Sequence, residues 1–136
     1  MDLNRSKYSK IGTLNCRGIT CDLKPRQLAT DMDDYKLDIL FLQETHLKGK
    51  GEIQITSFNG KTYNLNFSGI DINSKSRNCA GVGIILKANI KYSFVSVSER
   101  ICYIKYKVKH KTFMLISAYA PTLPISEKIQ IGRAHV

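Results

Sequence analysis

The first 43 residues alternate between strand-like and helix-like hydrophobic patterns. Residues 9–16 (SKIGTLNC) predict a strand, and residues 38–43 (DILFLQ) form a short, nearly continuous apolar run of the kind found in strands covered on both faces. Between these segments, Pro25 suits the first turn of a helix. Three residues then recur at helical spacing: Leu28, Met32 and Tyr35. The order strand, helix, strand predicts a crossover unit.

The rest of the chain has mainly strand-like periodicity. The polar segment 68–78 reads as a loop. Residues 102–108 alternate most regularly, and this alternation points Lys105 and Lys107 outward, with a hairpin turn predicted at His110-Lys111. The residues of this strand expected to face the core are Cys102, Ile104, Tyr106 and Val108. The predicted strands are 62–67, 81–86, 92–97, 102–108 and 112–119.

Length and composition predict one folded domain with a basic surface. The chain has 136 residues, of which 43% are hydrophobic, so a packed core is expected. Its 21 Lys and Arg residues outnumber 11 Asp and Glu residues, for a net charge of +10. Residues 1–71 carry 10 basic and 9 acidic side chains, whereas residues 72–136 carry 11 and 2. This balance favours an anionic partner, most simply nucleic acid, although solubility alone would also account for it.

Targeting signals and cysteine spacing point to an intracellular protein. No apolar run approaches the roughly 18 residues of a membrane span, and residues 1–10 lack the apolar segment of a secretory signal. The cysteines form no C-x-x-C pair, so we expect reduced, mostly buried thiols rather than a zinc site or disulfides. The four cysteines are Cys16, Cys21, Cys79 and Cys102.

Three predicted strands end in a polar side chain, namely Asn15, Glu44 and Tyr119. Ligand sites in α/β proteins collect at the carboxyl ends of strands. A carboxylate, an amide and a phenol together suit a hard cation and a phosphate. Taken singly, each has a simpler interpretation: Glu44 solvated in a turn, Asn15 bonded to turn backbone groups, and Tyr119 in the core with a bonded hydroxyl.

Four segments, in this order, resemble the endonuclease/exonuclease/phosphatase superfamily, which includes deoxyribonuclease I. Within it, the chain looks most like the apurinic-type endonuclease domain of non-LTR retrotransposons and craniofacial development protein 2-like sequences. The resemblance covers roughly residues 9 to 126. Its segments are 11–18 (IGTLNCRG), 38–46 (DILFLQETH), 80–86 (AGVGIIL) and 115–122 (LISAYAPT).

The resemblance implies an α+β fold, the four-layer α/β/β/α sandwich of deoxyribonuclease I, and metal-dependent hydrolysis of a DNA phosphodiester. It implies that Glu44 is a ligand of Mg²⁺ or Mn²⁺ and that Asn15 helps to position the metal or the phosphate. Tyr119 would contact the phosphate and stabilise charge in the transition state. Gln43 is a weaker candidate for a phosphate contact. For the full-length element it implies a nuclear protein.

The chain also departs from the family. The family's mechanism requires an Asp-x-Asn motif and a late Asp-His pair, and neither occurs in residues 120–136. Asp71-Ile72-Asn73 has the right letters but precedes Tyr119, in a polar loop. Residues 131–136 (IGRAHV) match a translated sequencing adapter, so we expect a flexible tail at 1–8, a partial domain at 9–130 and a non-native tail at 131–136.

This partial domain corresponds to the N-terminal half of the family fold. Half of the sandwich is expected to leave a sheet face or edge uncovered and to be inactive on its own. The alternatives are a non-catalytic retroelement remnant that still binds nucleic acid, and a phosphatase-type member of the superfamily. A further set of weaker phosphate contacts is predicted at Lys105, Lys107 and Lys109, for which a solvated sheet surface is the simpler interpretation.

Overall fold

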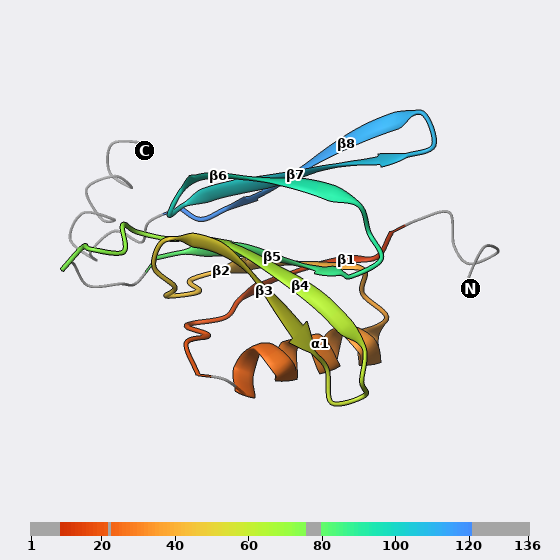
Figure 1. Cartoon of the computed structure of the whole chain (residues 1–136), viewed down its shortest axis with the longest axis horizontal. Coiled ribbons are helices and arrows are strands. Elements are labelled where there is room, and N and C mark those ends of the chain that lie inside the picture. Colours follow the sequence, from red (N-terminus) through yellow and green to blue (C-terminus); the bar gives the residue numbers. More distant parts are fainter. Residues whose placement is uncertain (1–8, 22, 76–79, 121–136) are drawn as a thin grey trace, which may run out of the picture.

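The computed structural model describes residues 9–21, 23–75 and 80–120. These residues form one helix and eight strands (Figure 1). In chain order they are β1 (Ile11–Asn15), α1 (Leu23–Tyr35), β2 (Ile39–Gln43), β3 (Lys50–Thr56), β4 (Thr62–Ser68), β5 (Val82–Lys87), β6 (Tyr92–Ser98), β7 (Ile101–Val108) and β8 (Lys111–Ala118). The tails expected at residues 1–8 and 131–136 lie outside the described residues.

The larger sheet has five strands in the order β1-β2-β5-β4-β3. β1 and β2 run parallel and are connected through α1, which confirms the predicted crossover unit. The other neighbours in this sheet are antiparallel. β2 and β5 lie in the middle and are apolar on both faces, as expected for strands with a layer on each side.

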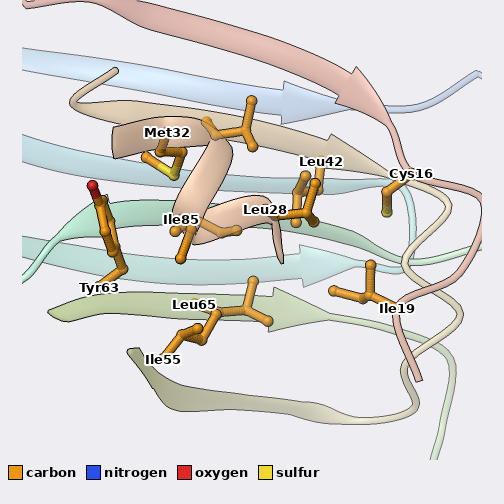
Figure 2. Close-up of a cluster of buried hydrophobic side chains, with 11 residues drawn as sticks. Cys16, Ile19, Leu28, Met32, Leu42, Ile55, Tyr63, Leu65 and Ile85 are labelled. Atoms are coloured by element: carbon orange, nitrogen blue, oxygen red, sulfur yellow. The ribbon is translucent and has the colours of Figure 1, made fainter. Parts of the chain in front are cut away.

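Helix α1 covers one face of this sheet, and the core between them is shown in Figure 2. Leu28, Ala29 and Met32 are the buried residues of the helix. Tyr35 was predicted to belong to this buried stripe, but it is 74% exposed. The helix ends there, since Lys36 turns the backbone to φ 57°. Leu37, whose amide donates to the carbonyl of Met32, packs against the core instead.

The smaller sheet contains β6, β7 and β8 in that order and lies on the opposite face of the five-stranded sheet (Figure 1). A second apolar cluster fills the space between the sheets, with Ile39 and Ile84 from one sheet and Cys102 and Ile104 from the other. Hydrogen bonds add to this contact, because the Asn66 Nδ2 amide donates to the Tyr92 hydroxyl at 2.6 Å. The described residues therefore form three layers: a helix, a five-stranded sheet and a three-stranded sheet. This arrangement confirms the α+β class.

The predicted alternation of β7 is correct over its first part. Cys102 and Ile104 are buried, and Lys105 and Lys107 are exposed. Val108 is exposed rather than in the core, because the β7–β8 hairpin extends past the five-stranded sheet (Figure 1). The turn is also one residue earlier than predicted: Val108 pairs with Lys111, so the two turn residues are 109 and 110.

Strand β3 is absent from the predicted elements. Its alternating Ile53 and Ile55 carry the usual period-2 signal, but Gly49 and Gly51 at its start obscure it. Ile55 is buried against the core under α1, whereas Ile53 is 42% exposed because β3 is an edge strand. The two-residue turn that joins such hairpins is also missing, since five residues separate β3 from β4.

Both sheets leave apolar side chains exposed on the same side of the molecule, as predicted for half of a sandwich. β8 lies over β2, so β1 extends beyond the smaller sheet. Ile11 and Leu14 on β1 are exposed, and so are Met114 and Ile116 on β8. Apolar surface of this kind on two neighbouring edges is typical of a surface that another part of a protein covers.

The described cysteines are free thiols, and most of them are buried. Cys16 and Cys102 are buried and Cys21 is exposed, all three as free thiols, while Cys79 lies outside the described residues. Burial raises the pKa of the Cys102 thiol to about 12. In the part of the chain that the structure describes, no helix is long and apolar enough to cross a membrane.

Candidate active site at the carboxyl ends of the strands

The loops after β1 and β2 bring Asn15 and Glu44 together. The parallel pairing of the two strands continues beyond their ends, because the amides of Cys16, Gly18 and Ile19 donate to the carbonyls of Gln43, Glu44 and Thr45 at 2.6 to 2.9 Å. The backbone that carries Glu44 is also held from its other side, where the amide of Thr45 donates to the carbonyl of Gly81. The carboxylate therefore projects from a segment fixed on two sides.

The side chain of Asn15 contacts that carboxylate directly. Its Nδ2 amide donates to Glu44 Oε2 at 2.5 Å, and its Oδ1 accepts a hydrogen bond from the backbone amide of Arg17 at 3.3 Å. The second bond fixes which end of the amide faces Glu44, because a backbone donor must meet the oxygen rather than the nitrogen. In this geometry Asn15 orients the carboxylate and presents a nitrogen to the site.

The backbone around Glu44 adopts conformations that most residues avoid. Arg17, Glu44 and His46 have φ values of 51°, 57° and 61°. A residue with a side chain pays roughly 1–2 kcal/mol to enter the left-handed region, and such residues cluster at functional sites. Three of them within two adjacent loops make this strained region a candidate functional site.

Two glycines make this close packing possible. Gly18 has φ +96°, and a Cβ added to it would lie 2.8 Å from Nδ1 of His46. Gly81 has φ +107°, and its Cβ would collide with the Oγ1 hydroxyl of Thr45, a fully buried residue. No side chain larger than hydrogen fits at either position without moving the loop that carries Glu44.

Tyr119 lies at the same end of the molecule, on the other sheet. Buried Ser117 donates its hydroxyl to the carbonyl of Leu42 at 3.2 Å and so fixes β8 against β2. Both strands run toward this end, and Tyr119 and Glu44 each lie two residues further along. Tyr119 is half-buried against the second apolar cluster, and its backbone amide donates to the carbonyl of Arg100. The structure thus gathers all three predicted strand ends at one end of the two sheets.

Gln43 faces the same side of the sheet but has a local partner. Its Nε2 amide donates to the Thr13 hydroxyl at 3.1 Å, across the β1–β2 pair. A phosphate contact from Gln43 would have to compete with that bond. Its predicted role stays a prediction.

The three predicted lysines lie elsewhere. Lys105 and Lys107 are on the outward face of β7, and Lys109 is in the turn that follows. Six residues of extended strand separate Ile101 from Lys107, which is about 20 Å. Ile101 pairs with Ala118, next to Tyr119. The structure therefore brings these lysines together with one another, but not with Glu44.

The site's donor set suits a magnesium ion that keeps most of its water. Among the described residues, no three His, Cys, Asp or Glu side chains come together as a ligand cluster. Glu44 supplies one carboxylate next to an amide, and Mg²⁺ binds through one or two carboxylates and several waters. The out-of-order Asp71-Ile72-Asn73 has a structural use instead, because Asp71 Oδ1 accepts the backbone amide of Asn73 at 2.8 Å and closes a turn.

Cys16 follows Asn15 directly, but its thiol is not suited to nucleophilic chemistry. It is 3% exposed and donates to the carbonyl of Gln43 at 3.2 Å. Burial raises the pKa of this thiol, and a thiolate is the reactive form. Its role is to fill the space under the β1–β2 loops.

No protein-family model matches the chain, and a search of curated proteins finds no relative. A solved structure described as the endonuclease domain of TRAS1, a telomere-specific non-LTR retrotransposon, is similar to it, with a TM-score of 0.50 and 16% sequence identity. The likeness covers 94% of this chain and 52% of that domain. The chain shares the fold of about half of this endonuclease domain. The sequence resemblance is therefore confirmed at the level of the fold, and the chain spans about half the length of its structural neighbour.

Sequence patterns missed the residues that hold the site rather than form it. Thr45, Gly81 and Ser117 are buried or strained and join the two sheets below Glu44 and Tyr119. All three lie inside the motif segments. A single hydroxyl or glycine next to a strand has too many ordinary uses to be recognised before the partner loop is known.

Proposed function

We propose that this chain is the N-terminal portion of a divalent-metal-dependent DNA endonuclease of a non-LTR retrotransposon polyprotein. The observation that carries the proposal is the Asn15–Glu44 contact at the ends of two parallel strands, in a fold shared with a retrotransposon endonuclease domain. A carboxylate held in a strained loop by an amide has no evident structural benefit here. It suits a metal ion and a phosphate.

In this proposal the three residues have distinct roles. Glu44 holds Mg²⁺ or Mn²⁺, and Asn15 keeps the carboxylate in one orientation through its Nδ2 amide. Tyr119 directs its hydroxyl to the phosphate and stabilises the charge that develops there. The bound metal supplies positive charge that polarises the phosphodiester and lowers the pKa of a bound water.

The same proposal accounts for the exposed edges. In a four-layer sandwich, further strands continue both sheets beyond β1 and β8, and a second helical layer covers the outer face of the smaller sheet. The domain then comprises residues 9–130 and a further half, with residues 131–136 as a non-native tail. The acid and base groups that complete the chemistry belong to that half, so residues 1–136 are expected to be inactive alone.

A non-catalytic remnant that binds nucleic acid is the second candidate. It is favoured by the small donor set at the site, since the described residues form no cluster of three His, Cys, Asp or Glu side chains around Glu44. It shares the DNA partner with the first candidate and differs from it in catalysis.

A nicking assay on supercoiled plasmid with Mg²⁺ separates the two. We expect no nicking by residues 1–136, and nicking by a chain completed with the downstream half of its own reading frame. Glu44→Gln should abolish that activity. The matched control Glu52→Gln, an exposed carboxylate on β3, should leave it unchanged. A completed chain that does not nick would leave only the non-catalytic remnant, whereas a completed chain that nicks equally well with Glu44→Gln would contradict the role of Glu44.

A further inference from the structure

The outer face of the three-stranded sheet is divided into an apolar half and a basic half. An apolar cross-strand row in the half toward the candidate active site contains Val95, Tyr103 and Ile116. The next rows toward the hairpin tip contain Ser93, Lys105 and Met114, then Lys107 and Thr112. The apolar half fits a covering layer of protein. The basic half does not, because buried lysines without partners are costly.

The basic half has a hollow of about 510 Å³. Three lysines line it, two from β7 and one from the position before β6, together with two hydroxyl-bearing residues and two tyrosines. These lining residues are Lys91, Tyr92, Ser93, Lys105, Tyr106, Lys107 and Thr112. Ammonium and hydroxyl groups are both hydrogen-bond donors, and together they are typical of a surface that binds phosphate oxygens.

No carboxylate in the described part of the chain neutralises these lysines. Lys87 and Arg100 form ion pairs, whereas Lys91, Lys105 and Lys107 form none among the described residues. Residues 100–120 contain no Asp or Glu at all. A sheet edge guarded against aggregation needs only scattered lysines. Here they converge on one hollow from β7 and from the residue before β6.

The hollow is separate from the candidate active site. Lys107 lies about 20 Å along β7 from the end at which Tyr119 and Glu44 lie. The hairpin that carries Lys107 also extends beyond the five-stranded sheet (Figure 1). A phosphate bound in the hollow is therefore not the phosphate at Glu44.

We propose that this hollow is a second DNA site, which binds the phosphate backbone of one strand without a metal ion and without reading the sequence. Lys105 and Lys107 are alternate residues on one face, about 7 Å apart, so they reach successive phosphates along a strand. Lys91 approaches from the position before β6, and the hydroxyls of Ser93 and Thr112 donate to the phosphate oxygens. The site is a consequence of this chain's own lysines and does not depend on the proposed catalysis.

Salt dependence of DNA binding tests the proposal. The probe is a fluorescein-labelled 20-nucleotide single strand, and a duplex of the same sequence, titrated with residues 1–136 in EDTA. Each lost phosphate contact lowers the salt slope by about 0.7 for a single strand and about 0.9 for a duplex. The triple variant Lys91→Gln, Lys105→Gln, Lys107→Gln should therefore lose about 2 units of slope with the single strand and more than 10-fold in affinity at 0.1 M salt.

The control keeps the change in net charge the same. The triple variant Lys10→Gln, Lys36→Gln, Lys61→Gln removes three exposed lysines that lie away from the hollow, and it should change the slope by less than 1 unit. The charge-preserving variant Lys91→Arg, Lys105→Arg, Lys107→Arg should keep the slope of the unmodified chain. Equal losses in the two Gln variants, or an unchanged slope in the first, would overturn the proposal. Because EDTA removes divalent metal from the assay, the outcome is independent of nicking.

Discussion

The two sheets of this protein bury their faces to very different degrees. The five-stranded sheet has α1 on one face and the smaller sheet on the other, and its central strands β2 and β5 are almost wholly buried. Among the described residues, the three-stranded sheet is covered on one face only, and its outward apolar residues are exposed. The five-stranded sheet is therefore packed on both faces, as in the core of a folded domain. The three-stranded sheet is packed on its inner face, and its outer face suits a further layer of protein.

The two sheets support the candidate site residues in different ways because they differ in burial. The strained loops that hold Glu44 follow from the well-packed sheet, because only a rigid support keeps residues with positive φ in place. Tyr119 comes from the less covered sheet and is tied to the first through Ser117. The candidate site thus joins a rigid half to one that we expect to be completed by further chain.

The largest predicted effect comes from replacing an apolar side chain with alanine in each of the two sheets. Leu65→Ala removes a fully buried side chain from β4 and should cost about 3 kcal/mol of unfolding free energy. Ile116→Ala removes a side chain that is 53% exposed on β8 and should cost less than about 1 kcal/mol. Denaturant unfolding of both variants measures the difference. Similar losses would mean that the outer face of β8 is covered in solution.

A second prediction concerns the support of the Glu44 loop. Gly81→Ala places a methyl group against the Thr45 hydroxyl at a φ of +107°, and we expect a loss of about 2 to 3 kcal/mol. Gly60→Ala is the matched control, since Gly60 has φ +87° with nothing within 4 Å of the new Cβ. It should cost about 1 kcal/mol. If both variants lost the same unfolding free energy, the close packing of Gly81 against Thr45 would contribute nothing to stability.

The pH dependence of stability tests the contact between the sheets. Burial raises the pKa of Cys102 from 9.0 to about 12. The folded state therefore keeps a proton that the unfolded state releases, and stability falls as the pH rises from about 9 to 12. The expected slope is about −1 kcal/mol per pH unit. Unfolding of Cys102→Ala measured at pH 8, 9.5 and 11 should lack this component. A parallel decline in both proteins would show that Cys102 is not buried between the sheets.

The smallest expected change in stability is at the open apolar face. Val95→Thr with Ile116→Thr should alter the unfolding free energy by about 0.5 kcal/mol or less, yet reduce self-association and dye binding to exposed apolar surface. Light scattering and ANS fluorescence provide the measurement. Unchanged self-association would mean that the surface responsible for it lies elsewhere, for example on β1.

The sequence predicts the elements better than it predicts their contacts. The crossover unit and the alternation at Cys102 and Ile104 could be predicted because both depend on the local periodicity of apolar residues. Tyr35 and Val108 were misplaced because each lies where an element ends and the layer beneath it stops. Whether a periodic apolar residue finds a partner depends on the extent of the neighbouring layer, which periodicity does not contain.

The candidate site shows the same division. Asn15, Glu44 and Tyr119 could be singled out because strand ends collect ligands in this kind of fold. The hydrogen bond from Asn15 to Glu44 depends on how β1 and β2 pair, and the role of Gly81 depends on Thr45 lying beneath it. The hollow near Lys91 could not be found from the sequence, because Lys91 and Lys107 are 16 positions apart and meet only through the β6–β7 pairing.

The most direct test of the account is where a divalent metal binds. Mn²⁺ titrated into ¹⁵N-labelled protein broadens the amide signals of residues close to the ion. We predict broadening centred on Asn15, Glu44 and Thr45, its loss in Glu44→Gln, and its retention in Glu52→Gln. Broadening that is unchanged by Glu44→Gln, or centred on another part of the chain, would contradict the assignment of Glu44 as the metal ligand.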